Sequence, residues 1–357
     1  MRSTTPDGTP PAAAEAAPDR SAFHRGERAL QSRVGARDRI ERIGHRVIRD
    51  AMPDEHRELF AELPFVVVGA LDERGRPWAS LLTGAPGFMR SPDPRTLRID
   101  AVAGDGDPIG AGLRAGAAVG LLAIQPETRR RNRLNGTIVE AGAGGFAVRV
   151  AQSFGNCPQY IQARAPVFAV GAAAGPRRAR AEGALLTVGA AALASRADTF
   201  FIATASPAAG GPDPAEGVDV SHRGGKPGFV RVSQEGGRSV LTSPDFSGNR
   251  FFNTFGNLLL EPRAGIVFVD FASGHLLSLT GEAEVIWDGP ELAAFAGAER
   301  LLRFRASEGA WLENAVPLRW SPDEWAPQLT ATGSWEEVER ALAAEGRPDL
   351  GPEGRQR

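Results

Sequence analysis

The run from Asp245 to Asn257, Asp-Phe-Ser-Gly-Asn-Arg-Phe-Phe-Asn-Thr-Phe-Gly-Asn, carries side chains suited to holding an anion. Its turn-forming residues lead into a predicted helix start, where backbone N–H groups bind phosphate well. Arg250 and Thr254 lie four residues apart, and Thr254 and Asn257 lie three apart, so we expect all three on one helix face. The candidate phosphate ligands of this region are Ser243, Asp245, Asn249, Arg250, Thr254 and Asn257.

A second polar cluster, Asp219-Val-Ser-His-Arg-Gly-Gly-Lys226, continues a predicted strand into a turn. Strand alternation places Ser221 and Arg223 on one face and His222 on the other. A charge-assisted hydrogen bond from an arginine to a phosphate contributes about 1.5–3 kcal/mol, so Arg223 and Arg250 together would dominate binding. The competing interpretation is that these polar residues only face water at a strand end. We expect Ser221, His222 and Arg223 to contact the ligand.

The elements that would position these residues occur twice in the chain. Gly84–Phe88 recurs as Gly225–Phe229, at an offset of 141 (225 − 84), and Gly120–Ile124 recurs as Gly265–Val269, at an offset of 145 (265 − 120). A Leu-polar-Gly triplet follows Gly120 and Gly265 at equal spacing, and Leu113 and Leu258 each lie seven residues before their glycine. Four matches in the same order indicate an internal duplication.

The two halves differ at the polar positions. The first half has Ile109 where the second has Thr254, and Gly112 where the second has Asn257. It keeps Ser80 as the counterpart of Ser221, but has leucines in place of the neighbouring histidine and arginine. Only the later copy is therefore equipped to hold a charged ligand.

The chain reads as mainly β with flanking helices. Short apolar runs bounded by Gly, Pro and Asp begin at Phe65 and resume after a loose stretch. Two such units in one chain predict small closed or partly closed barrels forming an intrachain pseudo-dimer. In the second unit, Leu276–Leu279 and Ala283–Trp287 read as separate strands. The expected segments are a disordered leader (1–22), N-terminal helices (23–63), a first barrel (64–170), a linker (171–189), a second barrel (190–288), a helical, tryptophan-rich extension (289–345) and a disordered tail (346–357).

Composition excludes several classes of protein. The net charge of −2 gives no electrostatic case for binding nucleic acid or an anionic membrane. The single cysteine, Cys157, cannot form an internal disulfide, and the five histidines show no metal-binding spacing. No apolar run is long enough to span a membrane, and the leader lacks the pattern of a signal peptide, so we expect a cytoplasmic protein. Because Lys226 is the only lysine, arginine-rich runs are discounted as functional signals.

These residues resemble the pyridoxamine 5′-phosphate oxidase-like FMN-binding split-barrel superfamily. Thr254-x-x-Asn-Leu-x-x-Glu-Pro262 is similar to its Lys-x-x-Asn-Leu-x-x-Asn-Pro pattern, with threonine in place of the phosphate-binding lysine and Arg250 as a substitute charge. Arg130–Gly136 resembles a strand in which Arg131 takes a flavin-contacting position, and Gln152–Tyr160 resembles a terminal segment of some members. The resemblance covers roughly residues 55–290 and is strongest at 218–287.

The resemblance implies two Greek-key split barrels with FMN between them. The second barrel would hold the phosphate, and the first barrel would place the side chains of Arg131 and Arg133 over the flavin. It implies an FMN-dependent oxidoreductase acting on a small redox substrate or an electron-transfer partner, with homodimerisation possible. No catalytic acid or base is identified. The alternative is a non-catalytic module that carries flavin or haem, or serves as the electron-transfer partner of a separate reductase. In the haem-binding case His222 or His275 would be the haem ligand.

Overall fold

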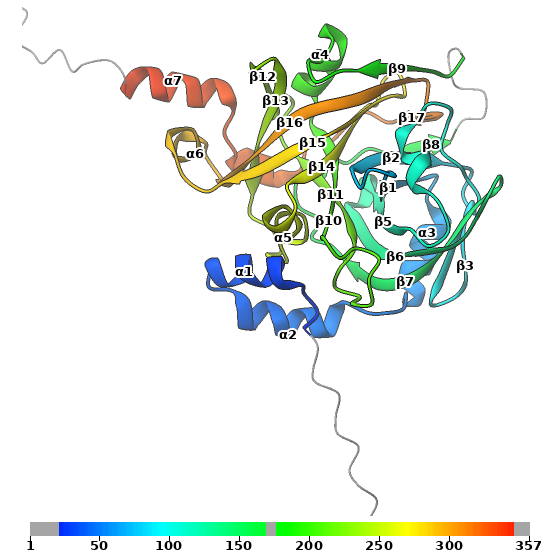
Figure 1. The fold of residues 1–357 in the computed structure, drawn as a ribbon. Coiled ribbons are helices and arrows are strands. Elements are labelled where there is room, and N and C mark those ends of the chain that lie inside the picture. The colour runs from blue at the N-terminus through cyan, green and yellow to red at the C-terminus, as the bar shows by residue number, and fades with distance from the viewer. Residues whose placement is uncertain (1–20, 169–175, 346–357) are drawn as a thin grey trace, which may run out of the picture.

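The computed structural model of this chain describes residues 21–168 and 176–345 (Figure 1). Residues 1–20 of the expected leader, residues 171–175 of the expected linker and the tail 346–357 lie outside the described residues.

Three helices precede the first strand, in agreement with the helical spacing of residues 23–63. At the start of the first helix, Nδ1 of His24 accepts a hydrogen bond from the N–H of Gly26, and the Glu27 carboxylate accepts one from the N–H of His24. This reciprocal capping box satisfies two helix-end donors. The helices are α1 (Arg25–Arg33), α2 (Arg37–Val47) and α3 (Asp54–Glu62).

The strands form two large antiparallel sheets. Those of the first half are β1 (Phe65–Leu71), β2 (Pro77–Thr83), β3 (Met89–Asp93), β4 (Thr96–Ile99), β5 (Ala118–Gln125), β6 (Arg130–Gly142) and β7 (Gly145–Gly155), with the 3-10 helix η1 (Pro108–Gly112) before β5. Those of the second half are β10 (Thr199–Ala205), β11 (Val218–Gly224), β12 (Arg231–Glu235), β13 (Arg238–Phe246), β14 (Arg263–Asp270), β15 (His275–Ile286) and β16 (Ala298–Glu313), with helix α5 (Asn253–Leu260) before β14.

The two sheets share one topology. The first has the spatial order β2-β1-β5-β6-β7-β4-β3, and the second has the order β11-β10-β14-β15-β16-β13-β12. Replacing each strand by its counterpart in the other half converts one order into the other. The chain therefore contains two split barrels in tandem, as its duplicated motifs predict, and Figure 1 shows them side by side.

The repeated glycines mark where each barrel meets the backbone of the other. A Cβ atom on Gly120 of β5 would lie 2.6 Å from the Val218 carbonyl oxygen of β11. A Cβ atom on Gly265 of β14 would lie 2.5 Å from the Pro77 carbonyl oxygen of β2. Both distances are too short for any side chain. This explains why glycine is kept at both positions of the repeat.

Two hydrogen bonds between the barrels follow the same pseudo-symmetry. Oγ of Ser278 donates to the carbonyl oxygen of Ala79 at 2.8 Å, and Nε of Arg133 donates to the carbonyl oxygen of Val220 at 3.1 Å. Ser278 is the counterpart of Arg133 (278 − 145 = 133), and Val220 is the counterpart of Ala79 (220 − 141 = 79). The second half therefore has a neutral contact where the first half supplies an arginine.

Each barrel has its own apolar core, and a third apolar cluster joins them. This interbarrel cluster includes Phe65 and Leu122 from the first barrel and Phe201 and Val267 from the second, all of them buried. Burying apolar surface between the halves favours their association within one chain. The interface is an intrachain pseudo-dimer.

The second sheet runs past residue 288, where we expected the second barrel to end. β16 pairs with both β13 and β15, so much of the expected extension belongs to the barrel. Leu276–Leu279 and Ala283–Trp287 belong mainly to one strand, β15, whose register against β16 shifts between Thr280 and Gly281. This bulge interrupts the alternation and makes one strand read as two.

The remaining segments cover the ends of the barrels. The expected linker contains β9 (Arg178–Glu182), which pairs with β16, and the start of α4 (Val188–Arg196). Near the C-terminus, Ser334 and Glu337 form a capping box before α7 (Trp335–Glu345). The indole of Trp335 packs against Phe295 of the second barrel. The other elements are β8 (Pro166–Phe168), α6 (Pro290–Ala294), β17 (Leu318–Trp320) and the 3-10 helices η2 (Pro126–Thr128) and η3 (Pro327–Ala331).

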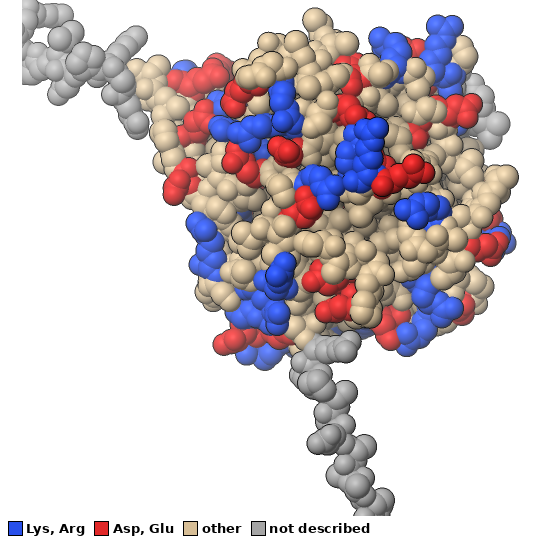
Figure 2. Space-filling view, viewed as in Figure 1, with Lys and Arg blue, Asp and Glu red and all other residues tan. Residues whose placement is uncertain are grey.

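Basic and acidic side chains are interspersed on the face shown in Figure 2, without a broad field of one sign. Among the described residues, no helix combines the length and apolar character needed to cross a membrane.

Candidate functional site

A cleft lies between the two barrels, beside the N-terminus of α5. It contains about 900 Å³ of space, including its opening to solvent. The first barrel contributes β6 and the segment after β7, and the second contributes β11, the end of β13 and the loop before α5. Nine of the eleven predicted ligand residues line it: Arg131, Arg133, Ser221, His222, Arg223, Asp245, Asn249, Arg250 and Thr254.

The other two predicted ligands, Ser243 and Asn257, do not line the cleft. Ser243 is buried inside the second barrel, next to a small space lined by Phe200 and Phe304. Asn257 donates from Nδ2 to Oγ1 of Thr204 at 3.1 Å and so ties α5 to β10. Both predicted ligand roles are corrected: these side chains support the fold behind the site.

The expected helix face shared by Arg250 and Thr254 is also corrected, because α5 begins only at Asn253. Arg250 lies in the preceding loop, with φ at 61°, and Phe252 has φ at 63°. Side chains other than glycine adopt this left-handed region at some cost in energy, and such residues cluster at functional sites. The loop places Arg250 at the mouth of the cleft, where its guanidinium is 4.0 Å from the Glu299 carboxylate.

The N-terminus of α5 has no side-chain cap. Phe252 occupies the N-cap position and offers no acceptor to the first-turn N–H groups. Beside this helix end, Oγ1 of Thr254 lies 2.8 Å from Oγ of Ser221. Ser221 in turn donates to the Asp219 carboxylate at 3.1 Å. The uncapped N–H groups of α5 are therefore the feature of this wall that favours an anion.

Arg133 reaches from β6 into the second barrel and is fully engaged there. Its guanidinium forms an ion pair with Asp219 at 2.8 Å and donates to Oγ of Ser221 at 2.6 Å and to Oδ1 of Asn253 at 2.5 Å. Both members of the ion pair are almost completely buried. The expected position of Arg133 over the flavin is therefore replaced by a role in joining the barrels and orienting Ser221.

Three charged side chains form a second cluster in the cleft. The Asp245 carboxylate pairs with Arg223 and also with Nε of Arg300, the latter at 2.9 Å. The guanidinium carbon of Arg223 lies 4.6 Å from the ring centre of Phe255, a cation–π contact that holds it in place. The Asp245 carboxylate lies between these two arginines, and Arg300 pairs in addition with Glu299.

Sequence reasoning missed Arg300, which lies in the stretch assigned to the C-terminal extension. The run Arg300–Arg305 does not alternate strictly between polar and apolar residues, and only the pairing of β16 with β13 places Arg300 beside Asp245. Assigning β16 to the second barrel as its last long strand would have identified Arg300.

Arg131 supplies a further positive charge. Its Nε donates to the carbonyl oxygen of Cys157 at 2.6 Å, and it forms no ion pair with a carboxylate of the described residues. Burial, followed by the charges of Arg133 and Arg223, lowers the pKa of Arg131 to about 9. The side chain therefore remains protonated at neutral pH while lacking a counterion.

The cleft has a net positive charge. Its lining contains five arginines and one carboxylate, that of Asp245. Two nearby acids, Asp219 and Glu299, offset two more of these charges, which leaves an excess of two (5 − 3). An excess of this size matches a phosphate dianion.

The equivalent position in the first half is closed by the chain itself. Asp107 occupies the N-cap position of η1, as Phe252 does for α5 (252 − 145 = 107). Its carboxylate accepts hydrogen bonds from the N–H of Ile109 at 3.1 Å and from the hydroxyl of Ser80. Ile109 and Ser80 are the counterparts of Thr254 and Ser221. A built-in carboxylate thus caps the helix end in the first half, whereas the equivalent helix end in the second half has no side-chain cap.

His222 lies against the cleft as a neutral ring. Burial lowers the pKa of His222 well below its ordinary 6.5, and the charges of Arg131 and Arg223 lower it further. The ring also makes an edge contact with Phe201. It adds no charge to the site but keeps a nitrogen available for hydrogen bonding.

This depressed pKa predicts a pH-dependent contribution to stability. Below pH 6.5 the unfolded chain binds a proton at His222 that the folded chain does not. The free energy of unfolding therefore decreases as the pH is lowered. The first half has a leucine at the position of His222. We expect His222→Leu to lose about 1.4 kcal/mol less stability than the wild-type protein between pH 7.5 and 5.5. Urea denaturation of both proteins at the two pH values measures it. If the two proteins differ in their free energy of unfolding by the same amount at both pH values, His222 is not a neutral buried ring.

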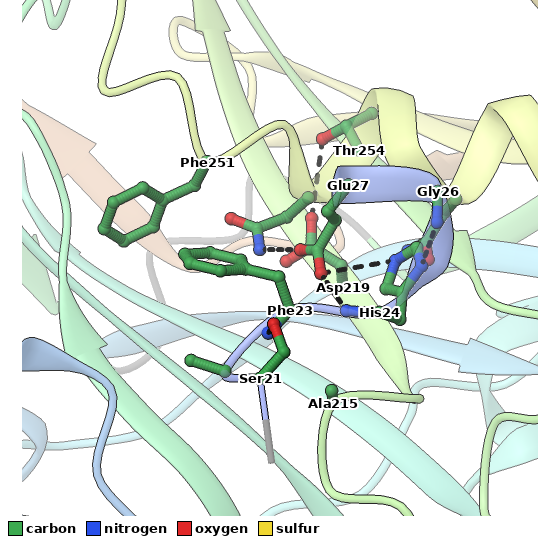
Figure 3. A network of polar contacts seen from close by, with 12 residues as sticks. Ser21, Phe23, His24, Gly26, Glu27, Ala215, Asp219, Phe251 and Thr254 are labelled. Carbon is green, nitrogen blue, oxygen red and sulfur yellow. Dashed lines mark hydrogen bonds and ion pairs between the residues drawn. The ribbon is translucent and has the colours of Figure 1, made fainter. Parts of the chain in front are cut away.

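A buried polar network supports the site from behind (Figure 3). Glu27 of α1 accepts hydrogen bonds from the backbone of His24 and from Asn253 at the start of α5. Burial raises the pKa of Glu27 well above its usual range. Gly26 packs directly on α5, where a Cβ would lie 2.1 Å from the Gly256 carbonyl oxygen. The N-terminal helix, which sequence reasoning left out of the site, thus positions α5.

Cys157 and Tyr160 also line the cleft, and the Tyr160 ring stacks on Phe246 with centres 5.0 Å apart. His275 lies elsewhere, where its Nδ1 accepts a hydrogen bond from the N–H of Asn314. In residues 21–168 and 176–345, no group of three or more His, Cys, Asp or Glu side chains is arranged to hold a metal ion.

Residues 52–177 of the chain match the family model described as pyridoxamine 5′-phosphate oxidase. This match falls on the first half, whereas the sequence resemblance is strongest in the second. No curated protein is significantly similar to the chain.

Several solved structures resemble parts of the chain. HupZ of Group A Streptococcus is 13% identical, with 34% of this chain and 90% of that chain covered and a TM-score of 0.27. A Clostridium acetobutylicum protein related to general stress protein 26, of the pyridoxine phosphate oxidase family, is 12% identical, with 42% and 95% covered and a TM-score of 0.25. HutZ, a haem storage protein from Vibrio cholerae, is 12% identical, with 34% and 90% covered and a TM-score of 0.22. Similarity at this level does not bear on what this chain binds.

Proposed function

Because this chain is a pyridoxamine 5′-phosphate oxidase-like split-barrel protein, we propose that the cationic cleft between its barrels binds FMN and that the protein is an FMN-dependent oxidoreductase. The flavin lies between the barrels, with its phosphate at the N-terminus of α5. The substrate is a small redox molecule or an electron-transfer partner.

The observation that carries the proposal is the difference between the two equivalent positions. In the first half, Ser80 and the N–H of Ile109 hold the carboxylate of Asp107. In the second half Phe252 replaces this aspartate, so the N-terminus of α5 has no side-chain cap. The hydroxyl of Ser221 donates instead to Asp219, a carboxylate already paired with Arg133. We infer that an anion from solution takes, at the N-terminus of α5, the place that Asp107 occupies in the first half.

The residues present fit a phosphate. Nε of Arg223 is buried and has no hydrogen-bond partner among the described residues, and Arg223 lines the polar cleft. Buried donors of this kind are costly unless a ligand or water pairs with them. Arg223, Arg250 and the open end of α5 would hold the phosphate, and Arg131 would meet the ligand from the first barrel.

FMN, when bound, supplies the redox chemistry, and the chain supplies binding and orientation. Arg131 and Arg223 hold positive charge in a partly buried site, where it interacts strongly with an anion. The Arg133–Asp219 pair fixes the distance between the barrels that form the two walls. His222 presents an uncharged imidazole to the ligand.

The absorption spectrum of the purified protein tests this function. We expect the two bands of oxidised flavin, release of FMN on denaturation, and bleaching of the bands by NADH or NADPH. A Soret band would instead indicate haem, with His222 in place as a ligand. Bound flavin that neither NADH nor NADPH reduces would indicate a passive carrier. A colourless protein that does not bind added FMN would contradict the proposal.

A negative charge placed at Ser221 tests where the phosphate lies. We expect Ser221→Asp to bind FMN about tenfold more weakly than Ser221→Asn, which has the same size and no charge. The difference between the two variants should shrink as salt is added, because salt screens charge repulsion. Fluorescence titration with FMN measures both affinities. Equal affinities for the two variants would place the phosphate away from Ser221.

A further inference from the structure

A second concavity lies on the outer side of the cleft, against α2. It is an open groove containing about 1190 Å³ of space, solvent included. One wall is the α2 face carrying Arg39, Ile43 and Val47, and the other comes from the loop 248–251. This groove has no counterpart in the duplicated fold, because α2 precedes both barrels.

The groove and the cleft share a boundary. Cys157, Asn249 and Arg250 line both spaces, so a molecule in the groove would lie next to a ligand in the cleft. Arg250 is held at this boundary by its left-handed backbone conformation and is 40% exposed on its side chain. It can therefore face a ligand in either space.

The chemistry of the groove is that of an amphipathic anion site. Its apolar residues are Ile40, Ile43, Val47 and Phe251, of which Val47 is 37% exposed. Its charged residues are Arg39 and Arg250, and no carboxylate is among the side chains that line it. An apolar wall between two guanidinium groups complements a carboxylate on an apolar body.

We propose that this groove binds the organic substrate, an aryl or alkyl carboxylate, beside the cofactor. Arg39 and Arg250 pair with the carboxylate, and Ile43 and Val47 cover the apolar body. Calling the ligand a substrate rests on the proposed function, whereas its binding to the groove does not.

The test uses the full chain and the fluorescent probe 1-anilinonaphthalene-8-sulfonate, an aromatic anion. We expect saturable binding of one probe, displaced by 4-phenylbutyrate but not by the uncharged 4-phenylbutanol. Arg39→Gln and Val47→Asp should each weaken probe binding at least about fivefold, through loss of a cation and gain of a repelling charge.

Two matched variants control for nonspecific effects. Arg42→Gln removes an exposed arginine from α2 that does not line the groove, and Val139→Asp alters an exposed valine on the first barrel. Both should leave probe affinity unchanged. FMN titration of all four variants should give wild-type affinity, because none of these residues lines the cleft.

The outcomes separate the two proposals. The groove proposal is overturned if no probe binds, if the controls lose affinity as much as Arg39→Gln and Val47→Asp, or if only Arg131→Gln releases the probe, which would place it in the cleft. If the protein binds the probe as expected but not FMN, the proposed function fails and the groove proposal stands.

Discussion

Replacing Arg223 and Arg250 together by alanine is expected to weaken FMN binding by about 100-fold or more. Each arginine would contribute a charge-assisted hydrogen bond of about 1.5–3 kcal/mol, and the exposure of Arg250 reduces its share. The fold should tolerate the change, because Arg300 still neutralises Asp245 after Arg223 is removed. Equilibrium titration of the stripped protein with FMN measures the loss.

A double variant of two other arginines provides the control. Arg114 and Arg319 are exposed and lie outside the cleft, so Arg114→Ala with Arg319→Ala lowers the net charge equally. We expect wild-type affinity from this control and unchanged circular dichroism from both proteins. Unaltered FMN affinity in the Arg223/Arg250 variant would mean that the phosphate binds elsewhere.

Removing the Asp219 carboxylate is expected to cause the largest loss of stability. Asp219→Ala leaves the guanidinium of Arg133 buried between the barrels without its counterion. Breaking a buried ion pair by deleting one partner costs roughly 3–5 kcal/mol. Because Arg133 retains hydrogen bonds to Val220, Ser221 and Asn253, we expect the lower end of this range. The free energy of unfolding from urea denaturation measures it.

Replacing both partners should restore much of the lost stability. The pseudo-symmetric positions lack this ion pair: Trp78 of the first half corresponds to Asp219, and Ser278 of the second half corresponds to Arg133. A neutral contact between the barrels is therefore compatible with the fold. We expect Asp219→Leu with Arg133→Leu to be more stable than Asp219→Ala, although its cleft should bind FMN poorly. A double variant less stable than Asp219→Ala would assign the cost to packing rather than to the unpaired charge.

Local patterns in the sequence predicted the repeated parts of the fold well. The glycine motifs at Gly120 and Gly265 identified two copies because backbone contact at those points excludes every other residue. Helical spacing located the N-terminal helices, and polar residues absent from the first half identified the region around α5. In each case the physical constraint acts within a few residues of the pattern that reveals it.

Contacts between distant segments escaped prediction. Ser243 and Asn257 belong to the right motif but point into the protein, because bonding within the second barrel turns them away from the cleft. Arg300 reaches Asp245 only through the pairing of β16 with β13. Glu27 reaches Asn253 only because α1 packs on α5.

The amino-acid sequence by itself determined that the chain is a duplicated β protein whose later copy carries polar residues that the first copy lacks. Glycine spacing and polar substitutions are properties of short segments, so they can be read without coordinates. The tertiary structure decided which arginines keep a free charge. Arg133 is neutralised by Asp219 while Arg131 is left without a counterion, and this depends on which side chains meet across the interface between the barrels.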